Sequence, residues 1–510
     1  MIASVDGQSM SPGDERGDPD ADRVRERHRE TASEVLVGDT DRHYIGGKLV
    51  DSDGGETFAT VDPTTGEELA RVQTGTAGDV ERAVDAALEA DDWGETSLAE
   101  RQRVLGTVAD RVESMRETFA TIETLDNGKP ITEARADVDQ IVDEFRYFAG
   151  TSRLCEGMAQ TLDGDRHFEI LREPYGVIGQ IVPWNYPLKM AVLGIAPALA
   201  AGNRVVVKPA EQTPLSILRF VREVDDIVPD GVVNVVTGFG PQAGDALASH
   251  PGIGKIGFIG STEVGREVMR SAAETITDVT LELGGKNPLI VCADVDIERA
   301  AEIATDAAFH NTGECCTAGS RLFVHEAISE AFLEAFLARV GSLRIGDPLE
   351  ETTDLGPKVS DAQRERTIEY VRLALDGDGE VLAGGGRPSA TGLADGYFVE
   401  PTVLRGVDHD SRVAQEEIFG PVELLFEWSE YDRMIERVND VSYGLAAGVL
   451  TRDLQVARQA ARDIEAGNVL INQYNHFPPG QPSGGFKQSG IGNATVEEYT
   501  REKTVNTRIR

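Results

Sequence analysis

Hydrophobic and polar residues alternate along this chain with two different periods. At 77–90 and 98–125 the apolar residues recur every three or four positions, which predicts two amphipathic helices. Between 175 and 275, short runs rich in Val and Ile, such as RVVVKPA at 204–210, are each followed by a helical stretch. This alternation predicts a parallel sheet that is covered by helices on both faces.

A second α/β unit is expected from about 285 to 480. A helical pattern at 296–311 precedes a polar loop there, and a strand followed by a helix is expected at 321–340. Two sheets imply a cleft between them. Ligands of open α/β sheets lie beyond the carboxyl ends of the strands, so the loops after Pro183, Lys208 and Gly260 are candidate binding loops.

The N-terminal segment has a different composition. Residues 1–43 are rich in Asp, Arg, Gly and Ser and offer little to bury, which predicts a mobile acidic tail that can become helical near 20–36. The fold is expected to begin near Tyr44, with short strands joined by glycine turns.

The charge balance is strongly acidic. The 510 residues include 88 Asp and Glu but 49 Lys and Arg, of which nine are lysine, and the formal net charge is −39. This charge repels nucleic acid and anionic membranes. Because the acidic residues are spread along the whole chain, we expect a surface that stays soluble at high ionic strength, and a salt-rich cytoplasm in a halophilic organism is a hypothesis.

The four cysteines, Cys155, Cys292, Cys315 and Cys316, are too few and too unevenly spaced for a disulfide framework. None lies in a CxxC pair suited to zinc, so we expect free thiols, no bound metal and a reducing, cytoplasmic compartment. The longest weakly polar run, at 191–202, is shorter than the roughly 20 residues of a membrane span. The N-terminus also lacks the apolar region of a secretory signal.

Two segments suggest a dinucleotide site. In GFIGSTEVGRE at 257–267, Gly260 ends a strand and Gly265 lies in the next helix, which would let backbone approach a pyrophosphate. The spacing is not GxGxxG, and a tight turn with close helix packing explains it equally well. In KPAEQTP, Lys208 could hold a ribose hydroxyl or phosphate, and Glu211 could accept both ribose hydroxyls and repel a 2′-phosphate. This pair favours NAD over NADP, with a surface ion pair as the alternative.

The loop NTGECCTAGSR at 311–321 holds the adjacent cysteines. Free cysteines are usually buried and inert, but this loop is polar and has little to bury. An exposed thiol near the positive end of a nicotinamide ring could ionise and act as a nucleophile.

Two further residues would complete a covalent mechanism. Asn185, in PWNYP, could donate to an oxyanion or could simply cap a turn. Glu282, in LELGGKNP, lies between apolar residues before two glycines, so its pKa should be raised and it could act as a general base. The alternative for Glu282 is a buried, paired charge.

Taken together, these motifs resemble the aldehyde dehydrogenase superfamily from about Tyr44 to the C-terminus. The matching segments occur in the family's order and at roughly its separations: ETLDNGKP, PWNYPL, GNRVVVKPAEQTP, GFIGSTEVGR, TLELGGKNP, NTGECCTAGSR, QEEIFGPV and PSGGFKQSGIG. The resemblance implies that Cys316 is the nucleophile, that Cys315 packs beside it, that Asn185 and the Cys316 backbone N–H hold the oxyanion, and that Glu282 activates water.

The resemblance also implies a cofactor site and a substrate tunnel. Lys208 and Glu211 would bind the adenosine ribose, Glu417 the nicotinamide ribose, and Phe419 would pack near that ring. The implied NAD site further includes Trp184, Gly260, Ser261 and Gly265, and the implied substrate tunnel includes Tyr186, Leu193, Phe477 and Ser483.

The family's architecture divides the chain into four parts. It implies an α/β fold with a Rossmann-type NAD-binding domain (44–158 and 175–284), a catalytic α/β domain (285–484) and an arm of a β-hairpin plus the C-terminal strand (159–174 and 485–510), preceded by the tail. The arm implies a homodimer or homotetramer.

Three departures from the family leave the substrate open. Leu193 and Gly194 replace a frequent Trp-Lys pair, and Ser483 replaces a frequent aromatic residue, so Tyr186 and Phe477 would be the main aromatic walls. The segment at 490–500 is short and carries Ala494, which leaves the exit of the proton unassigned. We therefore expect an aliphatic aldehyde or a semialdehyde rather than betaine aldehyde.

Other activities remain open from the sequence. A coenzyme A-acylating relative would lack the water-activating base, which Glu282 provides here. A non-catalytic NAD-binding protein would be expected to have lost Cys316, Asn185 or Glu282, and all three are present. Thiol esterase activity without cofactor could accompany the main reaction.

Overall fold

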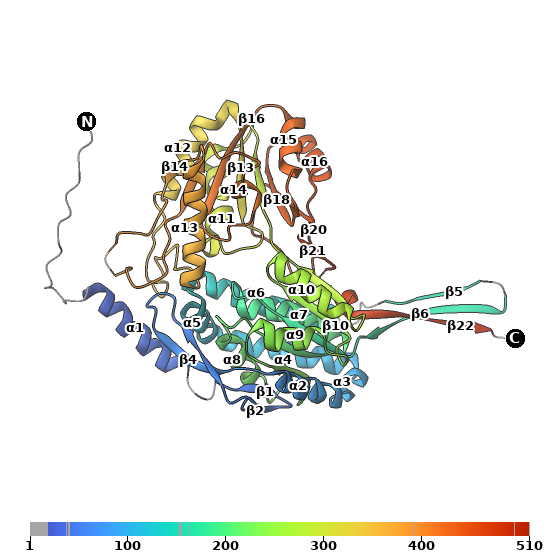
Figure 1. Ribbon diagram of the computed structural model, residues 1–510. Coiled ribbons are helices and arrows are strands. Elements are labelled where there is room, and N and C mark those ends of the chain that lie inside the picture. The colour runs from blue at the N-terminus through green and yellow to red at the C-terminus, as the bar shows by residue number, and fades with distance from the viewer. Residues whose placement is uncertain are drawn as a thin grey trace, which may run out of the picture.

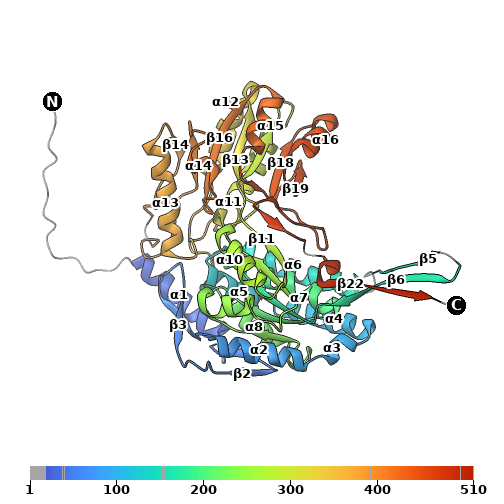
Figure 2. The ribbon, with the colours of Figure 1, turned by 45° about the vertical axis from the view of Figure 1, so that its right-hand side comes forward.

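The molecule consists of two α/β units, one standing on the other, and a β-arm that projects from the lower unit (Figure 1, Figure 2). The computed structural model describes residues 19–36, 38, 41–151, 156–162, 164–390, 392–493 and 495–508. Cys155 and Ala494 lie outside the described residues. Among the residues that are described, no helix has both the length and the apolar character needed to cross a bilayer.

The lower unit is built on an eight-stranded sheet in the order β2-β1-β9-β8-β7-β10-β11-β21. The five strands from β9 to β11 are parallel, and β1, β2 and β21 are antiparallel edge strands. The strands are β1 (His43–Ile45), β2 (Lys48–Val50), β7 (Val177–Ile181), β8 (Arg204–Lys208), β9 (Val233–Val235), β10 (Lys255–Ile259), β11 (Asp278–Glu282) and β21 (Gly490–Ile491). A separate hairpin pairs β3 (Thr57–Val61) with β4 (Glu68–Gln73).

Helices cover both faces of this sheet, as the sequence predicts. Val205 and Val207 of β8 belong to the core beneath α4, α6, α7 and α8, whereas Val206 belongs to the core beneath α2, α9 and α10. The expected helix at 98–125 is divided in two at Met115. The helices are α2 (Ala77–Glu89), α3 (Asp92–Glu95), α4 (Leu98–Ser114), α5 (Arg116–Asn127), α6 (Ile131–Thr151), α7 (Pro187–Ala201), α8 (Leu215–Glu223), α9 (Asp245–Ala248) and α10 (Thr262–Ala273).

The strand order reverses at β7. The chain steps from β7 to β8 and β9 on one side and then continues with β10 and β11 on the other. Such a switch point leaves a crevice at the carboxyl ends of the central strands. The loops after Pro183, Lys208 and Gly260 leave the sheet there, which agrees with the loops chosen from the sequence.

The upper unit contains a seven-stranded sheet in the order β14-β15-β16-β13-β12-β18-β19, parallel except for the edge pair β14–β15. Leu289 and Val291 of β12 face α11 and α12, and Ile290 faces the core that includes α13, α15 and α16. The strands are β12 (Asn287–Val291), β13 (Gly319–His325), β14 (Glu380–Ala383), β15 (Thr402–Arg405), β16 (Val422–Trp428), β18 (Ala446–Leu450) and β19 (Asn468–Ile471). The helices are α11 (Ile297–Phe309), α12 (Ser329–Val340), α13 (Asp361–Asp376), α14 (Arg412–Gln415), α15 (Tyr431–Asn439) and α16 (Leu454–Asp463), and a small ladder pairs β17 (Tyr443–Gly444) with β20 (Phe486–Lys487).

The arm is a three-stranded sheet in the order β22-β6-β5, from β5 (Met158–Thr161), β6 (Arg166–Pro174) and β22 (Thr500–Arg508). It extends away from both units (Figure 1). From the sequence, the C-terminal part of the arm is expected to comprise residues 485–510. In the structure the arm begins later, because β21 pairs with β11 of the lower unit. Only the last part of 485–508 therefore belongs to the arm.

The N-terminal segment also differs from expectation. Helix α1 (Pro19–Val35) lies within the expected helical stretch, but the expectation that this segment has little to bury is wrong, because Ala21 and His28 are buried. Both ring nitrogens of His28 are paired, Nδ1 with Asp62 at 2.6 Å and Nε2 with Asp347 at 2.9 Å. These two carboxylates belong to the lower and the upper unit, so α1 contacts both.

Candidate active site

The adjacent cysteines lie in the loop between α11 and β13. This loop begins with a turn in which Asn311, Thr312 and Gly313 all have positive φ, near 51°, 53° and 67°. Two consecutive non-glycine residues in this region are costly and require support from their surroundings. The Asn311 side-chain amide supplies it by donating to the carbonyl oxygens of Asn185 at 3.0 Å and Glu314 at 3.2 Å.

The backbone of Cys316 is fixed from the other side by the segment after β11. The Asn287 amide donates to the carbonyl oxygens of Cys316 at 2.8 Å and Ala318 at 2.9 Å. Gly285 lies so close that an added Cβ would stand 2.5 Å from the Cys316 carbonyl oxygen. The chain that carries Glu282 is thereby held against the cysteine loop.

The two thiols interact with each other and differ in acidity. A hydrogen bond with Cys315, burial, and the charges of Glu417 and Glu282 raise the pKa of Cys316 well above its usual value. Hydrogen bonds from Cys316 and from Thr317, whose Oγ1 lies 3.1 Å from Sγ, lower the pKa of Cys315, and the charge of His310 adds to this. Both cysteines are half-buried rather than exposed as expected. Cys315 is thus an electrostatic partner of Cys316.

Asn185 lies directly beside this loop. Its amide nitrogen donates to the carbonyl oxygen of Glu314 at 3.0 Å, and the residue is 4 % exposed. Glu314 is anchored in turn by a buried ion pair with Lys358 at 2.6 Å. An amide group has two N–H donors, so the second remains available for an oxyanion next to Cys316.

Glu282 ends β11 within electrostatic reach of Cys316. Burial raises its pKa to about 8, as the sequence predicts. Its Oε1 is buried and has no hydrogen-bond partner among the described residues. The alternative of a paired, buried charge is therefore wrong for this part of the chain, and the carboxyl group is suited to accept a proton near neutral pH.

Lys208 and Glu211 lie together beyond β8. The Lys208 Nζ is 3.7 Å from a Glu211 carboxylate oxygen and donates to the Pro209 carbonyl oxygen at 2.7 Å. Lys208 is 3 % exposed, and burial lowers its pKa, whereas the Glu211 side chain is 33 % exposed. The alternative interpretation, an ion pair on the surface, is therefore wrong, because Lys208 is buried.

The turn between β10 and α10 is closely packed. A Cβ on Gly260 would lie 2.6 Å from the Phe258 ring, and one on Gly265 would lie 2.5 Å from Leu283. Ser261 caps α10 by accepting from the Val264 N–H at 3.3 Å. Close helix packing therefore accounts for both glycines, and it also leaves the N-terminus of a twelve-residue helix at the crevice, which suits a phosphate group.

Glu417, Phe419 and Trp184 are the residues assigned to the nicotinamide end of the cofactor site. Glu417 accepts from the Gly285 N–H at 2.9 Å, and burial raises its pKa to about 7. The ring of Phe419, a residue with φ of 59°, meets that of Trp184 edge to face at 5.2 Å. The structure therefore places Glu417 beside the segment that carries Glu282, and it places Phe419 against Trp184.

The four residues assigned to a substrate tunnel differ in how deeply they are buried. Tyr186 is buried at 5 % exposure and hydrogen-bonds with Cys315, whereas Leu193, Phe477 and Ser483 are half-buried. The replacement at Gly194 has a steric reason, because a Cβ there would lie 2.4 Å from Gln180.

Sequence reasoning missed several polar residues around Tyr186. His310 stacks on the ring at 6.4 Å, and the Lys129 and Lys189 ammonium groups lie 4.4 Å and 4.7 Å from its centroid. Glu133 pairs with His310 at 3.2 Å. Burial lowers the pKa of His310, but Glu133 outweighs it, so the pKa rises to about 9. Two segments of the sequence could have indicated these lysines. Lys129 in LDNGKP and Lys189 in WNYPLK each lie in a motif with few charged neighbours.

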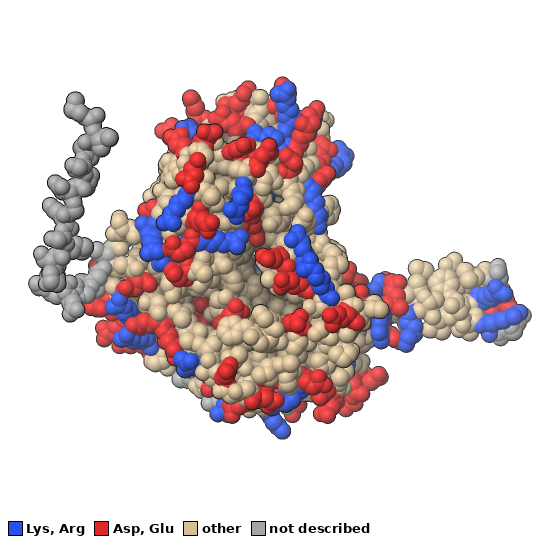
Figure 3. Space-filling model, in the orientation of Figure 1, with Lys and Arg blue, Asp and Glu red and all other residues tan. Residues whose placement is uncertain are grey.

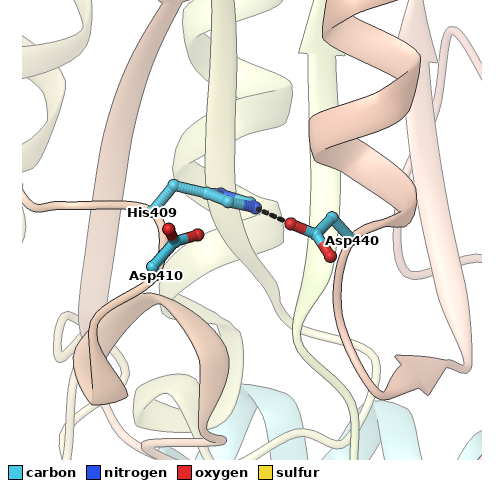
Figure 4. Close-up of side chains that lie close together, drawn as sticks. All are labelled: His409, Asp410 and Asp440. Carbon is cyan, nitrogen blue, oxygen red and sulfur yellow. Dashed lines mark ion pairs between the residues drawn. The ribbon is translucent and has the colours of Figure 1, made fainter.

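One group in the described residues has the composition of a cation site. His409, Asp410 and Asp440 offer ligand atoms within 4.8 Å of one another, and His409 Nε2 pairs with Asp440 at 3.4 Å (Figure 4). Burial and the charges of Arg321 and Arg437 lower the pKa of His409. The same two positive charges oppose a bound cation, so the group gives no support for a metal.

The fold, with a crevice at the switch point of its lower sheet beside the cysteine loop, is that of a dinucleotide-dependent dehydrogenase. Residues 49–508 match the Aldehyde dehydrogenase family, and the chain belongs to that family. It is an oxidoreductase that acts on the aldehyde group of its substrate.

Relatives of known name agree on the class and differ in substrate. The chain is 44% identical over 476 residues to "Acetaldehyde dehydrogenase" of Pseudomonas aeruginosa, covering 91% of this chain and 94% of the relative. It is 42% identical over 480 residues to "Benzaldehyde dehydrogenase, mitochondrial" of Antirrhinum majus, covering 92% and 89%.

Solved structures match over nearly the whole fold. The betaine aldehyde dehydrogenase of Staphylococcus aureus in complex with NAD+ superimposes with a TM-score of 0.92 at 35% identity, covering 95% of this chain and 98% of that one. The NAD+ complex of the aldehyde dehydrogenase from Bacillus cereus gives 0.91 at 40% identity, covering 94% and 98%. These neighbours hold NAD+ on the same fold.

Proposed function

We propose that this chain oxidises an aldehyde to a carboxylic acid with NAD, through covalent intermediates on Cys316. The observation that carries the proposal is Glu282, a half-buried carboxyl group whose Oε1 is buried without a hydrogen-bond partner among the described residues, whose pKa is raised to about 8, and which is held against the loop of the nucleophile.

The residues divide the reaction between them. The Cys316 thiol gives its proton to the Glu282 carboxylate, directly or through water, and its Sγ attacks the carbonyl carbon. The oxyanion that forms is held by the Asn185 amide and the Cys316 N–H, and Glu282 returns its proton to solvent before the next step. Bound NAD supplies the acceptor for the hydride that leaves when this thiohemiacetal collapses to a thioester. Glu282 then removes a proton from water, which attacks the thioester and releases the acid together with the free thiol.

The cofactor site supports NAD over NADP. Glu211 stands at the open side of the crevice beside the buried Lys208, where its carboxylate would accept from the ribose hydroxyls and repel a 2′-phosphate. Glu417 would hold the second ribose, and Trp184 and Phe419 would border the nicotinamide. The α10 N-terminus at Ser261 would meet the pyrophosphate.

A coenzyme A-acylating activity is the alternative. That reaction requires a thiol in place of water and has no use for a base beside the thioester. Since Glu282 is present and its carboxyl group is poised near neutral pH, hydrolysis is favoured.

The deciding experiment follows NADH formation with an aldehyde panel in high potassium chloride, for wild type, Cys316→Ala and Glu282→Gln, with and without coenzyme A. We expect turnover without coenzyme A that Cys316→Ala abolishes, and an acyl-enzyme that accumulates in Glu282→Gln. Turnover only in the presence of coenzyme A would establish the alternative.

The substrate, the assembly and the salt response are further parts of the proposal. The half-buried Leu193 and Ser483 leave room for an aliphatic aldehyde or a semialdehyde. The arm presents exposed Met158, Leu162 and Leu171, which supports its role in forming a dimer or tetramer. Acidic side chains are scattered over both units on the face seen in Figure 3, and together with the net charge of −39 this supports adaptation to high salt.

A further inference from the structure

Tyr186 lies at the centre of an unusual set of charges beside the cysteine loop. The ammonium nitrogens of Lys129 and Lys189 lie 4.4 Å and 4.7 Å from its ring centroid. Both distances are within the range in which a cation is attracted to an aromatic ring. The same ring hydrogen-bonds with Cys315 through its hydroxyl group, so these cations stand close to the nucleophile loop.

The two lysines differ in what can reach them. The Lys129 side chain has no exposed surface and is held by Asp137 at 2.7 Å and by Glu123 at 3.6 Å. Lys189 shares Asp137, at 3.1 Å, and its side chain is 21% exposed. Lys129 is therefore an internal charge, whereas the Lys189 side chain is in part accessible to solvent.

The position of Lys189 on α7 places it on the helix face that carries two residues of the proposed substrate tunnel, Tyr186 and Leu193. It follows Tyr186 by three positions at the start of α7 and precedes Leu193 by four, so these three residues share one face of the helix. Leu193 is one of the residues that the sequence assigned to the substrate tunnel. The Lys189 side chain therefore lies along the same wall.

A second carboxyl group completes the surroundings of Lys189. Glu144 lies on α6, two turns after Asp137, and its Oε2 is buried without a hydrogen-bond partner among the described residues. Lys189 acts on Glu144 electrostatically, whereas Glu133 of the same helix is neutralised by His310. An aromatic face with two carboxyl groups is what a quaternary ammonium group requires from a protein.

We propose that Lys189 places its own ammonium group in the subsite that would otherwise bind the cationic tail of an aldehyde, and so determines that this enzyme rejects quaternary ammonium aldehydes and accepts neutral or anionic ones. The inference rests on the proposed function for the reaction itself. It assigns a specificity-determining role to a residue outside the reacting set.

The consequence is a shift of the substrate preference towards cationic aldehydes when the lysine is removed. In Lys189→Met the ring of Tyr186 loses one cation, Asp137 loses one of its two lysine partners, and Glu144 loses the positive charge of Lys189. The Tyr186 ring then has one neighbouring ammonium group instead of two, so the subsite repels a substrate ammonium group less. Lys129 remains, but Asp137 and Glu123 balance its charge.

The test compares two aldehydes of the same shape. Betaine aldehyde carries a trimethylammonium group where 3,3-dimethylbutanal carries a tert-butyl group, so the ratio of their kcat/KM values reports charge alone. We expect wild type to prefer the neutral aldehyde, and Lys189→Met to shift the ratio towards betaine aldehyde by about tenfold. Lys189→Arg, which keeps the charge, and Lys48→Met, which removes an exposed lysine from an edge strand, should keep the wild-type ratio.

A binding measurement makes the test independent of turnover. Calorimetric titration with choline should give at least about tenfold tighter binding to Lys189→Met than to wild type. Equal choline affinities, or a ratio of kcat/KM values that stays within about twofold of wild type in Lys189→Met, would overturn the proposal. Oxidation of 3,3-dimethylbutanal by wild type tests the proposed function separately.

Discussion

His28 makes the attachment of the N-terminal helix depend on pH. Its ring is 2 % exposed and lies between Asp62 of the lower unit and Asp347 of the upper unit. Burial alone would lower the pKa of His28, but the hydrogen bonds and charges of Asp347 and Asp62 raise it from 6.5 to about 9. The folded protein therefore binds this proton more tightly than the unfolded chain does.

The size of the effect follows from the shift. A pKa difference of about 2.5 units at roughly 1.4 kcal/mol per unit corresponds to about 3 kcal/mol of stabilisation. Because the folded-state pKa is the higher one, this contribution is complete below pH 6.5 and disappears as the pH rises through 9. His28→Asn should therefore lower the free energy of unfolding by about 3 kcal/mol at mildly acidic pH and by much less in alkaline solution.

The assay is urea unfolding of both proteins at constant potassium chloride, followed by tryptophan fluorescence across this pH range. The difference between variant and wild type cancels the titration of groups that do not interact with His28. His167→Asn, which changes a partly exposed histidine of the arm, is the matched control and should show no such pH dependence. A loss for His28→Asn that is equal at acidic and alkaline pH would refute the reasoning.

Three further predictions concern the site. Cys315→Ala removes the hydrogen bond that raises the pKa of Cys316, so iodoacetamide should alkylate Cys316 faster at neutral pH than in wild type; an unchanged rate would contradict the coupling. In wild type, the rate of thioester hydrolysis, measured by single-turnover kinetics, should rise with pH to a plateau above about 8. Glu282→Gln should lower this rate by about 10²–10⁴-fold and remove its pH dependence. Glu211→Ala should narrow the preference for NAD over NADP in kcat/KM by about tenfold, and retention of the full preference would show that another residue excludes the 2′-phosphate.

The sequence by itself determined the class of the fold, and it supplied the prediction of which residues react. The strand at 204–208 is predicted to be fully buried because its consecutive valines, Val205 to Val207, make both of its faces apolar. Such a short-range pattern does not depend on the rest of the chain. The environment of Glu282 was likewise foreseeable, since apolar neighbours along a strand desolvate a carboxyl group wherever the strand lies.

Only the tertiary structure decided which charges meet. His28 lies 34 positions from Asp62 and 319 from Asp347, and no local pattern indicates that these three share one buried contact. The same holds for Tyr186, Lys189 and Asp137, which come from two helices that pack side by side, and for the edge strand β21, which leaves the arm to pair with β11. Ionic and aromatic contacts of this kind depend on distances of a few ångströms between segments far apart in the chain, and the packing of the whole fold sets those distances.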